Sequence, residues 1–105
     1  MDMVKGLKAL ASPTRLRILN LIGNPPAGTG VAGAAGQPIG ITAKSLTKQL
    51  GCSQPALAEQ MQILIGIGLV ESRRQGRWVI YSRDEERIRQ LKQTIIDQLL
   101  PPSPR

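Results

Sequence analysis

The chain has no histidine and no phenylalanine among its 105 residues, and it has a single cysteine, Cys52. The commonest catalytic base and metal ligand is therefore missing, and one cysteine cannot form a disulfide within the chain. Trp78 and Tyr81 are the only aromatic residues, too few for a platform on which single-stranded nucleic acid stacks. These absences argue against an enzyme, a metal site and a cofactor.

Long apolar runs are also missing, so we expect no transmembrane helix. The first residues place Lys5 and Lys8 within their apolar stretch and do not resemble a signal peptide. Together with the lone cysteine, this predicts a cytoplasmic protein without a membrane partner. A basic peripheral membrane protein would need a basic amphipathic helix, but here the positive charge is spread over several elements.

Acidic residues are scarce, because seven Asp and Glu stand against 14 Lys and Arg, a net charge of +7. Such a surface attracts the phosphates of nucleic acid whatever their sequence. The length suits one domain rather than two. We therefore expect a single small domain, residues 1–100, that binds nucleic acid.

Apolar residues at helical spacing predict two helices at the start of the chain. The first covers residues 2–11. Ser12 can cap the second, with Pro13 at its first position, and Gly23 ends it. We expect its inner face to hold Leu16, Leu19 and Ile22.

Residues 24–40 are rich in Gly, Ala and Pro and carry no charge, which predicts a flexible loop. They contain the pattern GxGxxG over residues 28–33. This pattern binds dinucleotides only between the strand and the helix of a βαβ unit, which the neighbouring sequence does not provide. We therefore expect no cofactor here.

A second helix pair follows this loop. Thr42 can cap a helix over residues 43–50 that stops at Gly51, and Ser53 or Gln54 starts another that stops near residues 65–67. The later helix presents Leu57, Met61 and Leu64 on one face. Two short helices joined by such a turn form a helix-turn-helix, in which the start of the second helix meets base edges in the major groove.

The rest of the chain predicts two strands and a last helix. The strands cover residues 69–73 and 77–81, with a tight turn at 74–76. Ser82 and Glu85 have the spacing of a capping box. The last helix would end at Pro101, and we expect residues 101–105 to be a disordered tail.

This order, α-α-α-α-β-β-α, predicts an α+β, mostly helical winged helix-turn-helix. The first and last helices carry apolar stripes outside its core, which favours a homodimer built through both. Alternatively, the two helices pack on each other within one protomer, and both arrangements can hold together. The expected interface residues are Val4, Leu7, Ile88, Leu91, Ile95 and Leu99.

The run KALASPTRLRIL at residues 8–19 resembles the opening of ArsR/SmtB-family repressors. Ser53-Gln54-Pro55 and the run GLVESRRQGRWVIY at residues 68–81 resemble that family's recognition helix and wing. The resemblance implies a homodimer that binds double-stranded operator DNA as a repressor and is released by an effector. The family's metal sensors use Cys pairs or His and carboxylate clusters, so the effector here is expected to be non-metal or unknown.

Two groups of residues are candidates for DNA contact. In the recognition helix they are Ser53, Gln54, Ala56, Glu59 and Gln60, and in the wing they are Arg73, Arg74 and Arg77. Glutamine pairs well with adenine edges. Residues 58–62 depart from the Ser-His-His-Leu-Lys often found in the family. Glu59 either alters operator preference by accepting from cytosine or is a solvated residue that weakens binding.

Other positions have two interpretations each. Cys52, next to a helix start, is either a redox switch or a packing residue, and packing is favoured. Trp78 either packs on its own domain, which is favoured, or touches DNA. Arg15 and Arg17 are expected to be structural or solvated rather than phosphate contacts. The alternative function is a winged-helix protein-interaction or architectural module without operator specificity.

Overall fold

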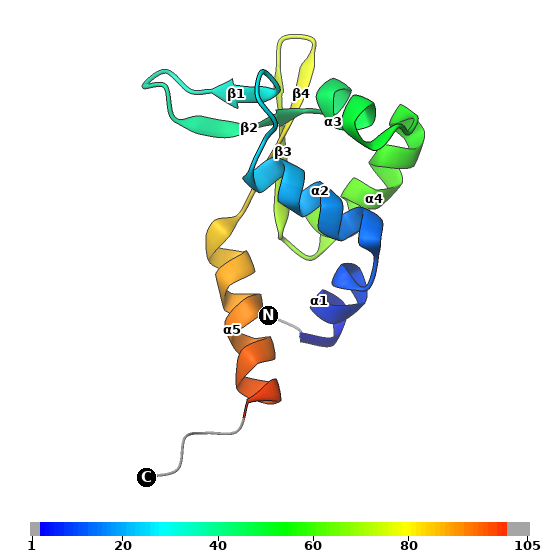
Figure 1. The fold of residues 1–105 in the computed structure, drawn as a ribbon, viewed down its shortest axis with the longest axis vertical. Coiled ribbons are helices and arrows are strands. Elements are labelled where there is room, and N and C mark those ends of the chain that lie inside the picture. Colours follow the sequence, from blue (N-terminus) through cyan, green and yellow to red (C-terminus); the bar gives the residue numbers. More distant parts are fainter. Residues whose placement is uncertain (1–2, 101–105) are drawn as a thin grey trace.

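Residues 3–100 are described by the computed structural model, and they form five helices and four strands. Figure 1 shows their arrangement. In chain order they are α1 (Met3–Leu10), α2 (Pro13–Gly23), β1 (Gly30–Ala32), β2 (Pro38–Thr42), α3 (Ala43–Leu50), α4 (Gln54–Gly66), β3 (Val70–Gln75), β4 (Trp78–Arg83) and α5 (Glu85–Leu99). The predicted winged helix-turn-helix is confirmed, with two additional strands. Residues 101–105, expected to be a disordered tail, lie outside the described residues.

Three helices start at the caps that the sequence indicates. Ser12, Thr42 and Ser53 each accept a hydrogen bond from the backbone amide three residues on, through their side-chain oxygens. Gly51 ends α3 in the left-handed region, at φ +66°. These caps satisfy backbone groups that a helix leaves open at its ends, so local chemistry sets the bounds of the helix-turn-helix.

The start of α5 differs from the expectation. Ser82 lies in β4 opposite Glu71, because the ladder between β3 and β4 continues to Arg83. Asp84 is the residue that caps α5, and the predicted capping box of Ser82 and Glu85 is wrong. Glu85 instead forms an ion pair with Arg83 at 2.8 Å.

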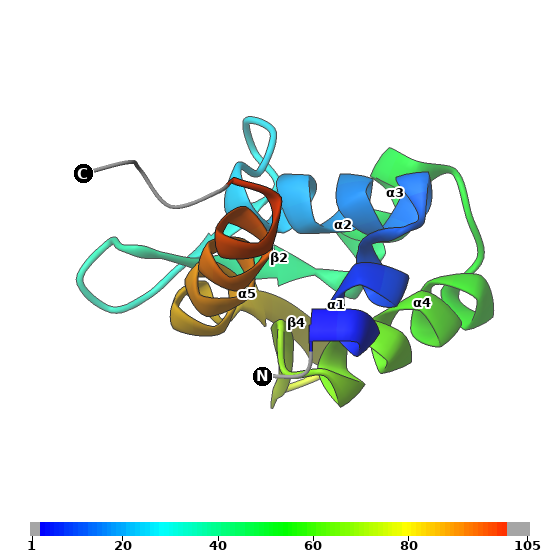
Figure 2. The same cartoon turned by 90° about the horizontal axis from the view of Figure 1, so that it is seen from below.

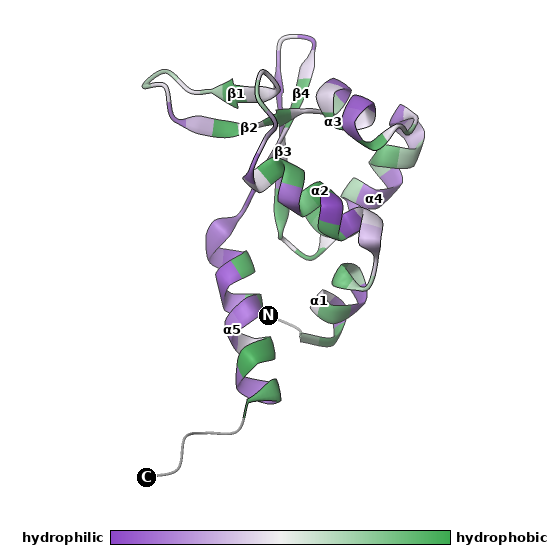
Figure 3. Ribbon diagram, in the orientation of Figure 1, coloured by the Kyte–Doolittle hydropathy of each residue, from purple (hydrophilic) through white to green (hydrophobic). Residues whose placement is uncertain are grey.

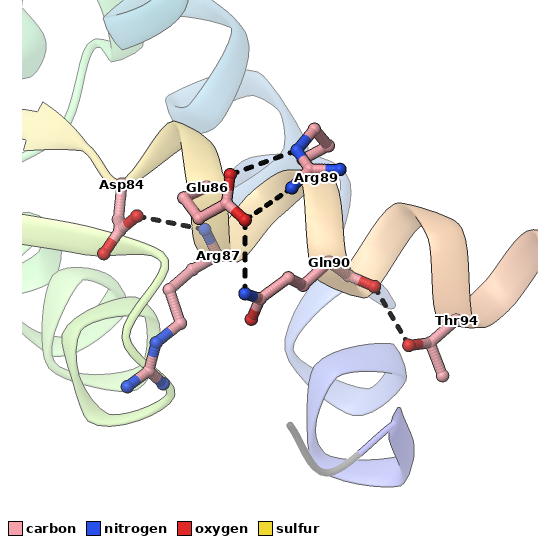
Figure 4. A network of polar contacts seen from close by, with 6 residues as sticks. All are labelled: Asp84, Glu86, Arg87, Arg89, Gln90 and Thr94. Carbon is pink, nitrogen blue, oxygen red and sulfur yellow. Dashed lines mark hydrogen bonds and ion pairs between the residues drawn. The ribbon is translucent and has the colours of Figure 1, made fainter.

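Figure 4 shows the polar contacts along the first turns of α5. Asp84 accepts from the amide of Arg87, and Glu86 accepts from the guanidinium of Arg89. The hydrogen bond from Arg89 and its positive charge lower the pKa of the exposed Glu86 carboxyl. Acidic side chains at this end also suit the positive end of the helix dipole.

The sequence suggested a flexible loop over residues 24–40, but the structure has two strands in this region. β1 and β2 form a hairpin there, and β2 also pairs with β4, so the sheet has the order β1-β2-β4-β3. Ile41 of β2 is fully buried. Gly40 has φ +148°, and a Cβ atom there would lie 2.2 Å from the backbone oxygen of Tyr81. Only glycine allows β2 this approach to β4, and strand patterns miss a segment whose partner lies 40 residues away.

The core lies between the sheet and helices α2, α3 and α4. Within α2 it takes Ile18, Leu19 and Ile22, whereas Leu16 is half exposed and does not face inward as expected. The three apolar residues predicted for α4 are buried as expected. The remaining members include Ile41, Leu46, Leu69, Val70, Tyr81 and Leu91.

α1 and α5 lie beside each other below this core, as Figures 1 and 2 show together. Gly6 marks their closest approach, because a Cβ atom there would lie 2.5 Å from Cδ1 of Leu91. Leu91 is 2% exposed. The two helices therefore pack on each other within one protomer, which was one of the two arrangements expected.

Candidate nucleic-acid interface

The first turns of α4 present a polar face to solvent. Ser53, Gln54, Ala56 and Glu59 are all exposed, while the opposite face of the helix packs into the core. The oxygen of Ser53 accepts from the amide of Ala56, which leaves its O–H free to donate outward. Four of the five predicted recognition-helix residues therefore share an open surface.

Gln60, the fifth, is held differently. Its side-chain oxygen accepts a hydrogen bond of 2.8 Å from Nη1 of Arg15. Arg15 also donates to the backbone oxygens of Ala9 and Lys8, so it ties the end of α1 to α4. Reading adenine needs that oxygen as an acceptor, so the internal bond competes with the role the sequence suggested for Gln60.

Arg17 is also used within the fold. Its guanidinium donates to the backbone oxygen of Gln49 at 2.9 Å, near the end of α3. Both arginines of α2 thus join helices together, in agreement with the structural role expected for them.

The wing carries the three predicted arginines on exposed positions. Arg73 lies opposite Ile80 and Arg74 opposite Val79, while Arg77 lies in the turn. Because Gln75 still pairs with Trp78, the turn consists of Gly76 and Arg77 rather than residues 74–76. Gly76 has φ +60°, which a two-residue hairpin turn of this kind demands.

The wing and the helix-turn-helix lie at the same end of the molecule. In Figure 1, the tip of the β3–β4 hairpin, α3 and the start of α4 occupy the upper part, far from the end of α5. Figure 3 colours much of the wing tip hydrophilic. The molecule therefore presents a polar helix start and an arginine-bearing ribbon together, which suits the major groove and the flanking backbone of DNA.

Known proteins share this arrangement. The chain is 30% identical over 92 residues to the uncharacterised HTH-type transcriptional regulator YbzH of Bacillus subtilis, covering 87% of this chain and 92% of YbzH. It is 32% identical over 85 residues to the HTH-type transcriptional regulator NmtR of Mycobacterium tuberculosis, covering 81% of this chain and 59% of NmtR. No family model matches the chain.

Among solved structures, the winged helix-turn-helix DNA-binding domain Mb0332 of Mycobacterium bovis superposes with a TM-score of 0.63. The match is 26% identical and covers 93% of this chain and 82% of that domain, which is described as homodimeric and as a possible ArsR-family regulator. This chain belongs to the ArsR family. It is a DNA-binding transcriptional regulator.

The ArsR-family chain exposes several of its predicted interface residues. Val4, Leu7 and Leu99 are 55%, 42% and 74% exposed. Figure 3 shows hydrophobic segments on α1 and on the last turns of α5. Ile88 and Ile95 are half-buried against the core. Leu91 is 2% exposed and packs within its own protomer, and its place in a subunit interface stays a prediction.

Cys52 lies in the turn of the helix-turn-helix, as predicted. It is half-buried and packs against the core, and its amide donates to the backbone oxygen of Thr47 at 3.2 Å. It also borders a surface hollow of about 420 Å³ that Thr14 and Arg17 line as well. These contacts favour the packing interpretation that the sequence analysis preferred.

Metal ligands do not gather within residues 3–100: no three His, Cys, Asp or Glu side chains are close enough to hold an ion. None of the described helices combines the length and the apolar character needed to cross a membrane.

Trp78 does not insert into the core. It is 39% exposed, and its ring lies 4.9 Å from the guanidinium carbon of Arg77 and 5.9 Å from Nζ of Lys44. Its packing partners are therefore two cations, one from the wing and one from α3. Sequence reasoning missed Lys44, because nothing local connects it to a tryptophan more than 30 residues away.

Proposed function

We propose that this regulator is a homodimer that recognises a specific double-stranded operator and represses transcription until an effector releases it. The observation that carries the proposal is the exposed polar start of α4 beside an arginine-bearing wing. Ser53, Gln54, Ala56 and Glu59 would meet base edges and nearby phosphates. Arg73, Arg74 and Arg77 would reach the backbone or the minor groove.

The exposed apolar residues of α1 and α5 support a second copy as the partner. Leu7 and Leu99 would leave apolar area in water on a lone protomer, and the Mb0332 domain is described as homodimeric. A two-fold axis near these helices would place two α4 helices on successive major grooves, about 34 Å apart. Each protomer would then make the same contacts with one half of a palindromic site.

The effector proposed here is not a soft metal ion. The chain has no histidine and one cysteine, so one protomer cannot supply the ligand sets that such ions prefer.

Fluorescence anisotropy tests operator binding directly. The duplex upstream of the protein's own gene is compared with a shuffled duplex across a salt series. We expect the native duplex to bind about a hundredfold more tightly or better, with steep salt dependence. Equal, weak binding to both duplexes would contradict operator recognition and favour an architectural or protein-binding module.

Charge reversal tests the wing. The double variant Arg74→Glu, Arg77→Glu should weaken binding to all duplexes at least about tenfold and flatten the logarithmic salt slope by about 4, because each protomer of the proposed dimer loses two phosphate contacts. The control is Arg87→Glu, Lys92→Glu on α5, which makes the same charge change away from the wing. Unchanged binding by the wing variant would remove the wing from the interface.

A further inference from the structure

Trp78 lies at the edge of the fold rather than in the core. It starts β4 at the base of the wing turn, with 39% of its surface exposed, and the buried part of the strand begins only two residues later at Ile80. Burial alone therefore does not explain why the largest side chain stands at this position. The contacts that its ring makes with two cations offer an explanation.

Two cations approach its ring from different elements. Arg77 belongs to the wing turn, and Lys44 belongs to the first turn of α3. Both lie within the roughly 6 Å at which an aromatic face attracts a cation. A rigid indole thus fixes the direction of two long side chains that would otherwise sample many rotamers.

Among the described residues, no carboxylate pairs with either of these two cations. Within residues 3–100 the ion pairs are those of Arg83 with Glu85 and of Arg89 with Glu86, and neither Lys44 nor Arg77 pairs with a carboxylate. Bringing two like charges to one ring raises the electrostatic energy of the free protein. An anion bound near both cations would relieve that repulsion.

A hollow of about 370 Å³ opens beside the ring. Lys44, Ser45, Gln75 and Trp78 line one part of it, and the segment Gly28–Val31 lines the other. Ser45 accepts from the hydroxyl of Thr42, so its own O–H is free to donate into the hollow. The two glycines of that segment contribute no side chain that would close it, and a phosphodiester group fits easily.

We propose that Trp78, Lys44 and Arg77 form a phosphate clamp at the junction of α3 and the wing. The clamp binds a backbone phosphate of the duplex in this hollow, with Lys44 as its charged contact and Ser45 as a neutral donor, while Arg77, which lies against the same ring but does not line the hollow, adds positive charge beside it. Trp78 is a positioning residue that holds the cations ready, which lowers the entropy lost on binding. This inference rests on the proposed DNA-binding function and assigns one phosphate contact within it.

Trp78 is the only tryptophan of the chain, so its fluorescence reports on the clamp without a label. The wild-type protein is titrated at low salt with a shuffled duplex, and tryptophan emission is recorded in parallel with the anisotropy of a labelled duplex. We expect emission to change with the same midpoint as the anisotropy. Binding by anisotropy without a change in emission would overturn the clamp and leave the proposed function intact.

Variants then separate the charged contact from the positioning residue. Lys44→Gln should lower the logarithmic salt slope by about 2, one contact for each protomer of the proposed dimer, whereas the control Lys92→Gln on α5 should leave it unchanged. Trp78→Leu should weaken binding about three- to tenfold, and Trp78→Tyr, which keeps an aromatic face, should recover most of the loss. Thermal unfolding of each variant checks that it is folded at the assay temperature.

The outcomes are distinct. If Trp78→Leu and Trp78→Tyr bind alike, or if Lys44→Gln keeps the wild-type salt slope, the clamp is wrong even though the duplex still binds. If the wild-type protein binds no duplex at any salt concentration, the proposed function fails and the clamp fails with it.

Discussion

The β1–β2 and β3–β4 hairpins are both antiparallel, but they differ in charge and in direction. The β3–β4 wing carries Arg73, Arg74 and Arg77 on exposed positions, whereas residues 24–40, which hold β1 and most of β2, carry no charge. The first hairpin points away from α4 in both Figure 1 and Figure 2, while the wing lies at the end that holds the helix-turn-helix. The wing therefore brings the positive charge that suits DNA, whereas the first hairpin brings none and contributes only backbone and small side chains beside it.

Their strands also form for different reasons. The wing has the β-branched and aromatic residues that prefer extended backbone, so its own sequence predicts it. β2 depends on β4: Ile41 pairs with Tyr81, and Gly40 permits the approach. The local sequence therefore predicts the β3–β4 hairpin, whereas the β1–β2 hairpin depends on the pairing of β2 with β4.

Gly40→Ala should have the largest effect, because it breaks the junction between the hairpins. The new Cβ atom would meet the backbone of Tyr81 in a conformation that alanine disfavours, which costs on the order of 3 kcal/mol of unfolding free energy. Urea unfolding at a fixed protein concentration measures it. Gly36→Ala is the control, since Gly36 has φ +81° but open space around it, and should cost about 1 kcal/mol. Equal losses would show that the approach to β4 is not what requires Gly40.

Asp84→Ala tests where the second hairpin ends and α5 begins. Loss of the cap should lower the unfolding free energy by about 1 kcal/mol. Ser82→Ala should stay within about 0.5 kcal/mol, because Ser82 lies in β4 and caps nothing. A larger loss from Ser82→Ala, measured by the same unfolding experiment, would restore the cap that the sequence suggested.

Adding charge to the first hairpin sharpens the contrast in DNA binding. Ala34→Lys with Ala35→Lys should raise affinity for any duplex a few fold, because Ala34 borders a surface hollow that Arg73 and Arg74 also line, so the new charges join those of the wing. Anisotropy compares this variant with the wing reversals. Unchanged affinity would mean that the turn of the first hairpin lies away from the DNA.

The smallest effect concerns pH. The first hairpin has no ionisable side chain, while the helix after the wing has Glu86, whose pKa Arg89 holds below its ordinary value of 4.5. A lowered carboxyl pKa stabilises the fold above that ordinary value, and the gain is lost as pH falls through the lowered one. Glu86→Gln should therefore reduce the unfolding temperature slightly at pH 7 and not at pH 3. The effect is small because the pair is exposed, and an equal reduction at both pH values would contradict it.

Much of the fold followed from local signals. The caps Ser12, Thr42 and Ser53, the stop at Gly51 and the strands of the wing were predictable because each depends on a few neighbouring residues. The cap of α5 was misplaced for the opposite reason. Serine and aspartate two residues apart are both good caps, and only the length of the β3–β4 ladder decides between them.

The candidate site also has features that local sequence predicts and features that depend on distant contacts. The exposed start of α4 and the wing arginines could be predicted from helical spacing and strand pattern. The internal bond of Gln60 to Arg15 joins residues 45 positions apart, and the approach of Lys44 to Trp78 joins α3 to the wing. No short window of sequence contains either pair.

The resemblance to the family, the order of the helix-turn-helix and wing, and the excess of positive charge can all be read from the sequence, because they rest on short motifs, local patterns and composition. Three features depend on the tertiary structure: residues 30–42 form a β-hairpin, Leu91 packs on Gly6 within one protomer, and two cations lie against the ring of Trp78. Such features depend on which surfaces meet after the chain has collapsed. Close packing between distant segments, rather than local propensity, selects them.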